Sequence, residues 1–583
     1  MTPYTLALAA LAATIHPTPT LASSDPNTFD FVIVGGGTAG LALANRLSEL
    51  PEITVAVVEA GSDESTNPKV TTVAGFGGGA GFNTHIDWAY ETTEQIHAGG
   101  RRLEYHSGKA WGGTSTMNGM TYIRAEAAQI DAWETIRNAG WNWSTLWPYH
   151  LKSETFSTPT IAQLAAGASY IDSYHGRNGP LNVAYQYGLH NGTFASLVNE
   201  TWQNLGMPFN QDASGGSLRG FFVWPQTLDR EANVREDAAR AYYHPRRGDR
   251  ISWLQSNGSE AVADGVEYTT PDGKACVLHA KREVILAAGS VRSPAILELS
   301  GVGNPKILSP LGIEIKIPLP AVGENALEQP NSVMLYNSSG NNTFTGFAPY
   351  VAYSSARDIF GNNTQSISAE ISSQLESWAV KTAAESNGAL SVSALTSLYT
   401  LQHDLIFMQD VPCVEILTTA VGGTLASAFF ILLPFSRGRV HVTSSAPGIY
   451  PAVDPGYFAI DFDRVLQREI AKRVARFWGT EPVGSLVGNR VLPTLQDVPG
   501  DATDEEWDDW VLGSVTANHH LLGTTAMLPR ELGGVVNSNL TVYGTRNVRV
   551  VDASILPAQV SGHLTSIIYA VAERAGDVIK DGL

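Results

Sequence analysis

The sequence predicts an α/β domain built around a parallel sheet, joined to a second, α+β domain that contains an antiparallel sheet. An apolar run of strand length at 31–34 stops at three consecutive glycines and continues into a helix-forming segment. The buried-strand pattern recurs at 284–286, again before a glycine, and at 548–551. A chain of 583 residues is too long to fold around one compact core. Residues 332–508 have their own composition, with two long helix-like stretches followed by short strands.

The three glycines after the first strand belong to the spacing G-x-G-x-x-G at Gly35, Gly37 and Gly40. The first permits a tight turn, the second lets the backbone approach a pyrophosphate, and the third seats the helix against the strand. Thr38 and Ala39 open that helix, whose N-terminal NH groups attract phosphate. The spacing predicts a Rossmann-like dinucleotide site. The alternative is a glycine turn with a purely structural role.

An acidic residue supports the dinucleotide interpretation. A second apolar run at 55–58 ends at Glu59, nineteen residues after Gly40. A carboxylate at this position accepts a hydrogen bond from the adenosine ribose and disfavours a 2′-phosphate. Strand, glycines, helix, strand and acid in this register indicate a binding site far more strongly than the glycines alone.

Composition excludes several kinds of partner. The net charge is −19, and no run of basic residues is longer than an isolated pair such as Arg246 and Arg247, so neither nucleic acid nor an anionic membrane surface is an expected partner. No CxxC or HExxH spacing is present, and we expect no metal. The two cysteines, Cys276 and Cys413, are expected to be small buried apolar residues, although one disulfide is possible.

The N-terminus predicts a secreted, extracellular protein. Residues 4–14 form an apolar stretch too short to span a bilayer, so 1–23 are expected to be a cleaved signal peptide, with a disordered N-terminus as the alternative. N-x-Ser/Thr sequons agree with N-linked glycans on such a protein. The sequons lie at Asn142, Asn191, Asn199, Asn257, Asn337, Asn341, Asn362 and Asn539.

A second glycine-rich stretch, at 107–124, reads SGKAWGGTSTMNGMTYIR. Its small residues let the backbone pass close to a flat or anionic group, and Asn118 offers an amide in the middle of the run. Tryptophan, methionine and asparagine among the glycines favour a ligand-facing loop over a tight surface loop. The candidate binding residues of this loop are Gly112, Thr114, Asn118, Gly119 and Met120.

The chain is expected to pass back and forth between the two domains. A buried strand at 548–551 is followed by Asp552 and Ala553, two more candidate cofactor contacts, and 566–580 reads as a helix. The dinucleotide-binding domain is therefore expected to comprise 28–154, 220–330 and 515–583, and the substrate domain 155–219 and 331–514.

Two histidines are candidates for catalysis. His520 stands in ANHHLLGTTAM, and His563 stands in VDASILPAQVSGHLTSIIYAVAERAGDVI. A lone histidine is structural by default, but a pair in Gly/Thr loops that lead back to a dinucleotide lobe favours acid and base chemistry.

These motifs resemble those of the glucose–methanol–choline (GMC) oxidoreductases over essentially the whole chain. Residues 35–59 resemble the family's FAD fingerprint, 112–120 its first signature and 289–303, GSVRSPAILELSGVG, its second. H-x-x-G-T at His520 and S-G-H at His563 resemble the catalytic pair. VREDAARAYY, RELGGVV and the C-terminal helix look most like fungal FAD-dependent glucose dehydrogenases and glucose oxidases.

The resemblance implies a secreted fungal flavoprotein that oxidises an alcohol. The base would be His520, with His563 orienting the hydroxyl, because a carbinol C–H bond yields hydride to flavin N5 only as its hydroxyl proton leaves. His519 is the rival base, but the G-T spacing favours His520. No histidine lies at 114–116, so non-covalent FAD is expected. Oxygen or a quinone as acceptor, and a monomer or a homodimer, all remain open.

Departures from the sugar-oxidising relatives bear on the substrate. Those relatives hold the sugar hydroxyls with a tyrosine, a glutamate and an arginine, whose places are taken here by Phe76, Ala428 and Thr516, whereas Asn518 is retained. Each buried hydroxyl left unpaired costs about 1–3 kcal/mol. Glucose is therefore not the expected substrate. The alternatives are a sugar dehydrogenase or oxidase with a rearranged site, and an FAD-containing cyclase without net redox chemistry.

An aryl or otherwise apolar alcohol, such as a secondary-metabolite intermediate, fits the apolar side chains expected at the site better. The candidate substrate-binding residues are Phe76, Ala428, Phe430, Thr516, Asn518 and His519, with Phe429 and Leu521 as further apolar neighbours.

Overall fold

A computed structural model describes residues 25–73, 79–190, 192–242, 250–254, 260–270, 273–340 and 344–583. Several sequence predictions fall outside these ranges. They are the signal peptide at 1–23, the substrate-site candidate Phe76, and the sequons at Asn191, Asn257 and Asn341.

The first domain is organised around a mainly parallel sheet in the order β2-β1-β12-β23. The parallel-paired parts of β1, β2 and β12, at 31–34, 55–58 and 284–286, are continuous apolar runs, as expected for a sheet that is covered on both faces. β11 and β10 extend the sheet in antiparallel fashion from β12. The bounds are β1 (Thr28–Val34), β2 (Val55–Val58), β10 (Arg250–Leu254), β11 (Val262–Thr269), β12 (Ala275–Leu286) and β23 (Val548–Val550).

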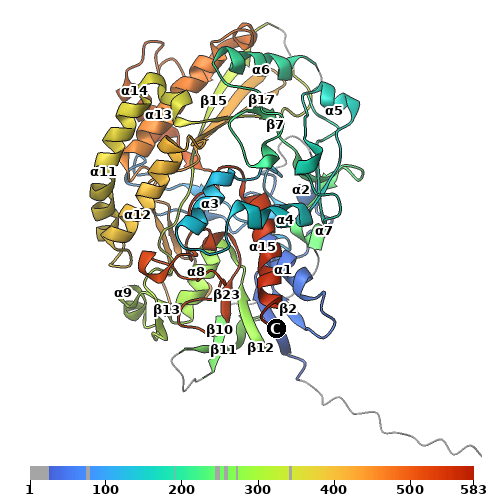
Figure 1. The fold of residues 1–583 in the computed structure, drawn as a ribbon, viewed down its shortest axis with the longest axis vertical. Coiled ribbons are helices and arrows are strands. Elements are labelled where there is room, and N and C mark those ends of the chain that lie inside the picture. Colours follow the sequence, from blue (N-terminus) through green and yellow to red (C-terminus); the bar gives the residue numbers. More distant parts are fainter. Residues whose placement is uncertain are drawn as a thin grey trace, which may run out of the picture.

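Two helices that are far apart in sequence pack side by side on this sheet, α1 (Thr38–Leu47) and α15 (Leu564–Lys580) (Figure 1). Gly576 of α15 allows the close approach, because a Cβ there would lie 2.8 Å from the Arg46 Cβ of α1. The Arg46 guanidinium donates to the fully buried Glu573 of α15, at 2.5 and 2.7 Å. The C-terminal helix is thereby fixed onto the first βα unit of the chain.

The four parallel strands end at the same edge of the sheet. There the chain leaves β1 at Gly35, β2 at Glu59, β12 at 287–289 and β23 at 551–552. In open α/β sheets ligands bind at this carboxyl edge. The fold therefore brings together every loop that the glycine and acid motifs singled out.

The second domain contains an antiparallel sheet in the order β21-β15-β18-β17-β16-β7, with the short β22 paired to β15. In Figure 1 this sheet occupies the upper part of the molecule, and helices α11–α14 gather along one side. The strands are β7 (Gly220–Val223), β15 (Pro330–Ser338), β16 (Tyr350–Ser354), β17 (Val414–Val421), β18 (Thr424–Ile431), β21 (Val487–Leu492) and β22 (Thr516–Ala517). The helices are α11 (Thr364–Glu385), α12 (Val392–His403), α13 (Asp461–Trp478) and α14 (Asp504–Ser514).

Two short strands differ from the expected domain boundaries. β7 lies in the part expected to belong to the dinucleotide lobe from 220 onward, yet it forms the edge of the antiparallel sheet. β22 lies in the C-terminal part expected from 515 onward, yet it pairs with β15. The chain therefore enters the loop that carries His520 directly from the antiparallel sheet. Strands of two and four residues carry too little periodicity to reveal this in the sequence.

The two faces of the antiparallel sheet have different environments. Glu415 pairs with Phe430, and Leu417 pairs with Ala428, so these side chains share one face. Phe429 points to the opposite face, where it is fully buried and its ring lies 6.4 Å from that of Trp510. The expectation that Phe429 is an apolar neighbour of the substrate is therefore wrong, because side chains alternate along a strand.

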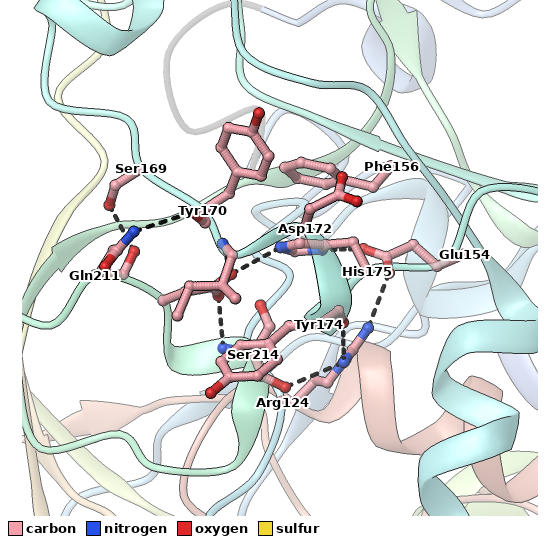
Figure 2. A network of polar contacts seen from close by, with 12 residues as sticks. Arg124, Glu154, Phe156, Ser169, Tyr170, Asp172, Tyr174, His175, Gln211 and Ser214 are labelled. Atoms are coloured by element: carbon pink, nitrogen blue, oxygen red, sulfur yellow. Dashed lines mark hydrogen bonds and ion pairs between the residues drawn. The ribbon is translucent and has the colours of Figure 1, made fainter.

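A buried ionic network anchors the 155–219 segment to the first domain (Figure 2). The Arg124 guanidinium donates to Glu154 at 2.8 Å. His175 lies between two carboxylates, with Nδ1 3.0 Å from Glu154 and Nε2 3.0 Å from Asp212, and Phe156 stacks on its ring at 3.7 Å. The network lies directly behind the loop that carries His563.

His175 should make stability depend on pH. Burial alone would lower its pKa, but hydrogen bonds to Asp212 and Glu154 outweigh burial and raise it. A histidine whose pKa is higher in the folded than in the unfolded protein stabilises the folded state. This stabilisation is complete at pH values below the unfolded-state pKa of about 6.5, and it is lost as the pH rises through the folded-state pKa. Leaving buried carboxylates without their partner costs about 3–5 kcal/mol. His175→Ala should therefore lower the thermal unfolding temperature strongly at pH 5.5 and less at pH 8.

The control is His85→Ala, whose side chain is 63% exposed. Equal losses for His175→Ala at the two pH values would show that stacking on Phe156, and not the charge of His175, carries the contribution.

Candidate active site

A cavity of about 500 Å³ lies at the carboxyl edge of the parallel sheet. Both glycine-rich loops, the ends of all four parallel strands and the two catalytic-type histidines contribute to its wall. The predicted residues that line it are Gly35, Gly37, Thr38, Ala39, Glu59, Thr114, Asn118, Gly119, Asn518, His519, His520, Asp552, Ala553 and His563.

The first glycine loop has no space for a side chain at two of its three motif glycines, Gly35 and Gly40. Gly35 has φ +110°, and a Cβ there would lie 2.3 Å from the Ala287 carbonyl oxygen. A Cβ on Gly40 would lie 1.9 Å from the Gly35 carbonyl oxygen, which explains why Gly40 sits behind the wall, where α1 packs on the turn. Gly37 faces the cavity, where a Cβ would meet only Gly113 at 3.7 Å. The backbone NH groups at the start of α1 are therefore accessible to a phosphate.

Glu59 is held in a fixed orientation at the end of β2. The backbone N–H of Gly36 donates to Oε2 and that of Gly61 donates to Oε1, both at 2.7 Å. The residue lines the cavity, and a carboxylate oxygen can accept more than one hydrogen bond. Glu59 can therefore accept hydrogen bonds from a ribose.

The second glycine loop packs against the first. A Cβ on Gly113 would lie 2.7 Å from the Gly37 Cα, and the backbone N–H of Gly112 donates to the Gly36 carbonyl oxygen at 2.8 Å. Gly112 has φ +93°, so it serves the turn and does not line the cavity.

The Asn118 amide, also in this loop, is oriented by neighbouring donors. Its Oδ1 accepts from Arg235 at 2.8 Å and from the backbone N–H of Met120 at 2.9 Å. Its Nδ2 donates to Thr565 at 3.2 Å. Met120 has φ +59° and is fully buried behind the loop, so its role is to shape the loop.

Asp552 connects β23 to the helix that follows β12. Its Oδ2 accepts from the backbone N–H of Gly289 at 2.9 Å and from the Ser293 hydroxyl at 2.5 Å, and its Oδ1 accepts from the backbone N–H of Ser554 at 2.8 Å. Burial raises the pKa of Asp552 above its ordinary value. The accessible NH groups at the start of α1, the glycine cradle and the oriented ribose acceptor together fit a dinucleotide without a 2′-phosphate.

The two histidines lie together at the wall of this cavity. The ring centroids of His520 and His563 are 5.0 Å apart at an interplanar angle of 86°. Phe430 packs edge-on against both, 6.3 Å from each ring. The structure thus brings together two imidazoles from segments 43 positions apart, beside one apolar ring from the substrate sheet.

The tautomer of His520 follows from its hydrogen-bond partners. Gln329, which is fully buried, donates from Nε2 to the carbonyl oxygens of Leu432 and Val560 at 3.1 and 3.4 Å. Its Oε1 must therefore face His520 Nδ1, which lies 2.7 Å away. An amide oxygen only accepts, so Nδ1 carries the proton. Asn518 Nδ2 lies 3.0 Å from both Gln329 Oε1 and His520 Nδ1, and it donates to Oε1 because a protonated Nδ1 cannot accept.

This assignment leaves His520 Nε2 with a free lone pair. Burial holds the pKa of His520 well below its ordinary value, and the neighbouring imidazoles of His563 and His519 lower it further. The ring is therefore neutral at neutral and mildly acidic pH. A neutral imidazole with a free Nε2 can accept a proton from a bound hydroxyl.

The loop that carries His520 is held by Glu328. The carboxylate Oε1 accepts from the backbone N–H of His520 at 3.1 Å and from that of Gln329 at 2.9 Å. Burial raises the pKa of Glu328 to about 8, despite these backbone donors. Gln559 also donates to the His520 carbonyl oxygen at 3.2 Å. The base candidate is therefore fixed through its main chain as well as its ring.

Glu415 plays the corresponding part for His563. Its Oε1 lies 2.9 Å from His563 Nε2, and its Oε2 accepts from the Tyr353 hydroxyl at 2.6 Å. Tyr353 is its cross-strand neighbour on β16, and burial raises the pKa of that phenol well above its ordinary value, so it remains a donor. A carboxylate beside Nε2 holds a proton there, which leaves Nδ1 of His563 for a ligand.

The structure places the remaining substrate-site candidates unequally. Asn518 and His519 line the cavity. Ala428 lies on the cavity-facing side of the sheet, beside Leu417, which lines the cavity. Thr516 is exposed on β22 and donates to the Asn331 carbonyl oxygen at 3.3 Å, and it does not line the cavity.

Three residues that contact the site were not predicted from the sequence. Glu415 stands as a single acid in the apolar run VEILTTAV, and that isolation was a usable signal. Phe82, which lines the cavity, is an aromatic residue in a glycine-rich stretch. Gln329 carries no local signal, because nothing in ALEQPNS distinguishes it from an ordinary loop glutamine.

The described ranges contain no group of three or more metal-ligating side chains. None of their helices combines the length and apolarity needed to cross a membrane. Cys276 and Cys413 are both free thiols, and burial raises the pKa of Cys413.

Comparisons with known proteins agree with this site. Models of the GMC oxidoreductase family match residues 29–331 and 434–572. The glucose oxidase-like protein fsoC of Humicola fuscoatra is 48% identical, over 98% of this chain and 99% of that protein. A glucose oxidase of Aspergillus carbonarius is 34% identical, over 95% and 92%.

Solved structures show the same fold. An FAD-dependent oxidoreductase from Chaetomium thermophilum has a TM-score of 0.84 at 27% identity, over 95% of this chain and 99% of that one. The resemblance noted from the motifs, including that to the fungal glucose oxidase branch, is confirmed, as is the predicted two-domain fold. The chain belongs to the GMC oxidoreductase family and is an FAD-binding oxidoreductase.

Proposed function

We propose that this protein oxidises an apolar or aryl alcohol, with His520 as the base. The observation that carries the proposal is the oriented, neutral imidazole of His520, 5.0 Å from His563 in the cavity that contains the dinucleotide cradle. Bound FAD supplies the acceptor for the hydride that leaves the carbinol carbon.

The residues of the chain account for the fate of the hydroxyl proton. Gln329 holds the Nδ1 proton of His520, so Nε2 accepts the proton of the substrate hydroxyl. His563, held by Glu415, offers Nδ1 on the other side and orients the hydroxyl between the two rings. Both imidazoles are fixed before substrate binds, which lowers the entropic cost of reaching the reactive geometry.

The walls around the pair support an apolar substrate. Phe430 packs edge-on against both imidazoles without lining the cavity itself, and Leu417, Leu521 and Phe82 line the cavity. A bound sugar needs protein groups that form hydrogen bonds with its hydroxyls in place of water. Neither Ala428 nor Thr516 provides a charged side chain for this purpose. A sugar stands as the second candidate, because a glucose oxidase is among the relatives that are 34% identical.

We also propose that the protein is extracellular, carries N-linked glycans and holds FAD non-covalently. Three sequons, at Asn337, Asn362 and Asn539, are exposed and accessible to glycosylation. No histidine lies in the 114–116 segment that faces the cavity. Acid precipitation of the purified protein should release the yellow colour into the supernatant, and colour retained in the pellet would contradict non-covalent binding.

Anaerobic mixing with a panel of benzylic alcohols and glucose tests the reaction. Bleaching of the visible flavin band at a higher rate with a benzylic alcohol than with glucose is the expected result. Faster bleaching by glucose would establish the sugar alternative. A band that no alcohol bleaches would favour the non-redox cyclase. Reoxidation by oxygen or by a quinone dye then identifies the acceptor.

A further inference from the structure

His519 lines the same cavity as the catalytic pair without being part of it. The residue has φ +63°, a left-handed conformation that a histidine adopts at a cost of about 1–3 kcal/mol unless its surroundings impose it. The neighbouring backbone is imposed by Glu328, which binds the N–H of His520. The strained turn aims the His519 ring away from His520 and toward Phe82, Tyr105 and His106.

The protons of the His519 ring can be assigned. The backbone N–H of His106 donates to Nδ1 at 3.2 Å, so Nδ1 is an acceptor and the proton of the neutral ring is on Nε2. Burial, together with the charge of the nearby His106, lowers the pKa of His519 to about 4. His519 is therefore an uncharged donor above that pH. No described residue accepts a hydrogen bond from its Nε2.

The other polar side chains of this cluster already have partners, and the Tyr105 hydroxyl accepts from the backbone N–H of Leu521 at 3.2 Å. His106 has Nδ1 2.6 Å from Asp87 and Nε2 3.3 Å from Glu104, so both its nitrogens face carboxylates. Its ring stacks on Phe82 at 3.8 Å and 15°. The rings of Phe82 and Tyr105 each lie 5.5 Å from that of His519, at interplanar angles of 71° and 63°, and together they form an aromatic wall that contains one N–H donor.

We infer that His519 determines substrate specificity by donating from Nε2 to a carbonyl-type oxygen carried by the apolar or aryl alcohol. A lone donor without a neighbouring acceptor suits a ligand group that only accepts, and a group that must donate would be left unpaired. The aromatic wall suits a planar, conjugated group. This inference rests on the proposed function, and it narrows the substrate to alcohols that bear a ketone, ester or lactone oxygen away from the carbinol.

Matched ligands that differ only in the acceptor test the inference. The reactive pair is 4-acetylbenzyl alcohol and 4-isopropenylbenzyl alcohol, with the two 3-substituted isomers, because the acetyl and isopropenyl groups have nearly the same shape. The unreactive pair is acetophenone and α-methylstyrene, whose binding to the oxidised holoenzyme is followed by perturbation of the flavin spectrum. Wild type, His519→Phe and His519→Gln are compared, since glutamine places an amide donor near the position of Nε2.

Wild type should bind acetophenone about tenfold more tightly than α-methylstyrene, the factor for one satisfied hydrogen bond. For each enzyme, the flavin reduction rate constant divided by Kd is measured with the acetyl and with the isopropenyl substrate, and the first value is divided by the second. This preference for the acetyl substrate should be about tenfold lower in His519→Phe than in wild type, and it should recover in His519→Gln. Comparing ratios across variants removes the electronic effect of the acetyl group. Unchanged ratios, or equal affinities of the two unreactive ligands, would overturn this inference alone. Failure of every alcohol in the panel to bleach the flavin would overturn the proposed function, and this inference with it.

Discussion

Replacing His520 with alanine is expected to slow anaerobic flavin reduction by about 10²–10⁴-fold, the usual contribution of a positioned general base. The hydroxyl proton would then have no acceptor of the right geometry, because Nε2 of His520 is the free lone pair that Gln329 leaves exposed to the cavity. FAD binding should persist, since the dinucleotide cradle is formed by other residues. Stopped-flow reduction with a benzylic alcohol measures the effect, and added imidazole should restore part of the rate.

The matched control is His279→Ala. His279 stands at the amino end of β12, paired with Thr28 at the opposite edge of the sheet from the cavity, and it should leave the reduction rate unchanged. A rate for His520→Ala close to that of wild type would show that another group removes the proton, with His563 as the next candidate.

Replacing Gln329 with methionine is expected to slow reduction by about 10²-fold, although Gln329 does not line the cavity. Methionine has nearly the same volume but cannot accept the Nδ1 proton. The imidazole is then free to carry its proton on Nε2, which removes the basic lone pair. The loss should appear in the reduction rate constant with little change in substrate Kd, because Gln329 acts through His520.

Replacing Gln329 with glutamate distinguishes a role in setting the protonation of His520 from a purely structural role. Gln329→Glu keeps an acceptor for Nδ1 and adds negative charge beside the ring, which raises the pKa of His520. Since the base must be neutral, the acid limb of the pH profile should move to higher pH, while activity at alkaline pH is retained. Gln203→Met, on the exposed surface of helix Phe194–Asn204, is the control. An unshifted limb in Gln329→Glu would contradict the tautomer assignment.

Sequence reasoning succeeded where the determinants are local. Gly35, Gly37, Gly40 and Glu59 are set by the geometry of one βα unit, and the spacing alone predicted the cradle that the structure contains. It failed for Phe429 and Phe430, which are adjacent in sequence but point to opposite faces of β18. Which of the two meets the histidines depends on the register of the sheet, and an apolar run does not encode register.

The sequence by itself predicted the family, the dinucleotide site and the two candidate histidines, because glycine spacing, an acid at the end of a strand and short loop motifs act over a few residues. Only the tertiary structure decided what surrounds those histidines. Gln329 lies 191 positions from His520, and Glu415 lies 148 positions from His563. Their hydrogen bonds, which set tautomer and orientation, exist only once the substrate sheet has folded onto the parallel one.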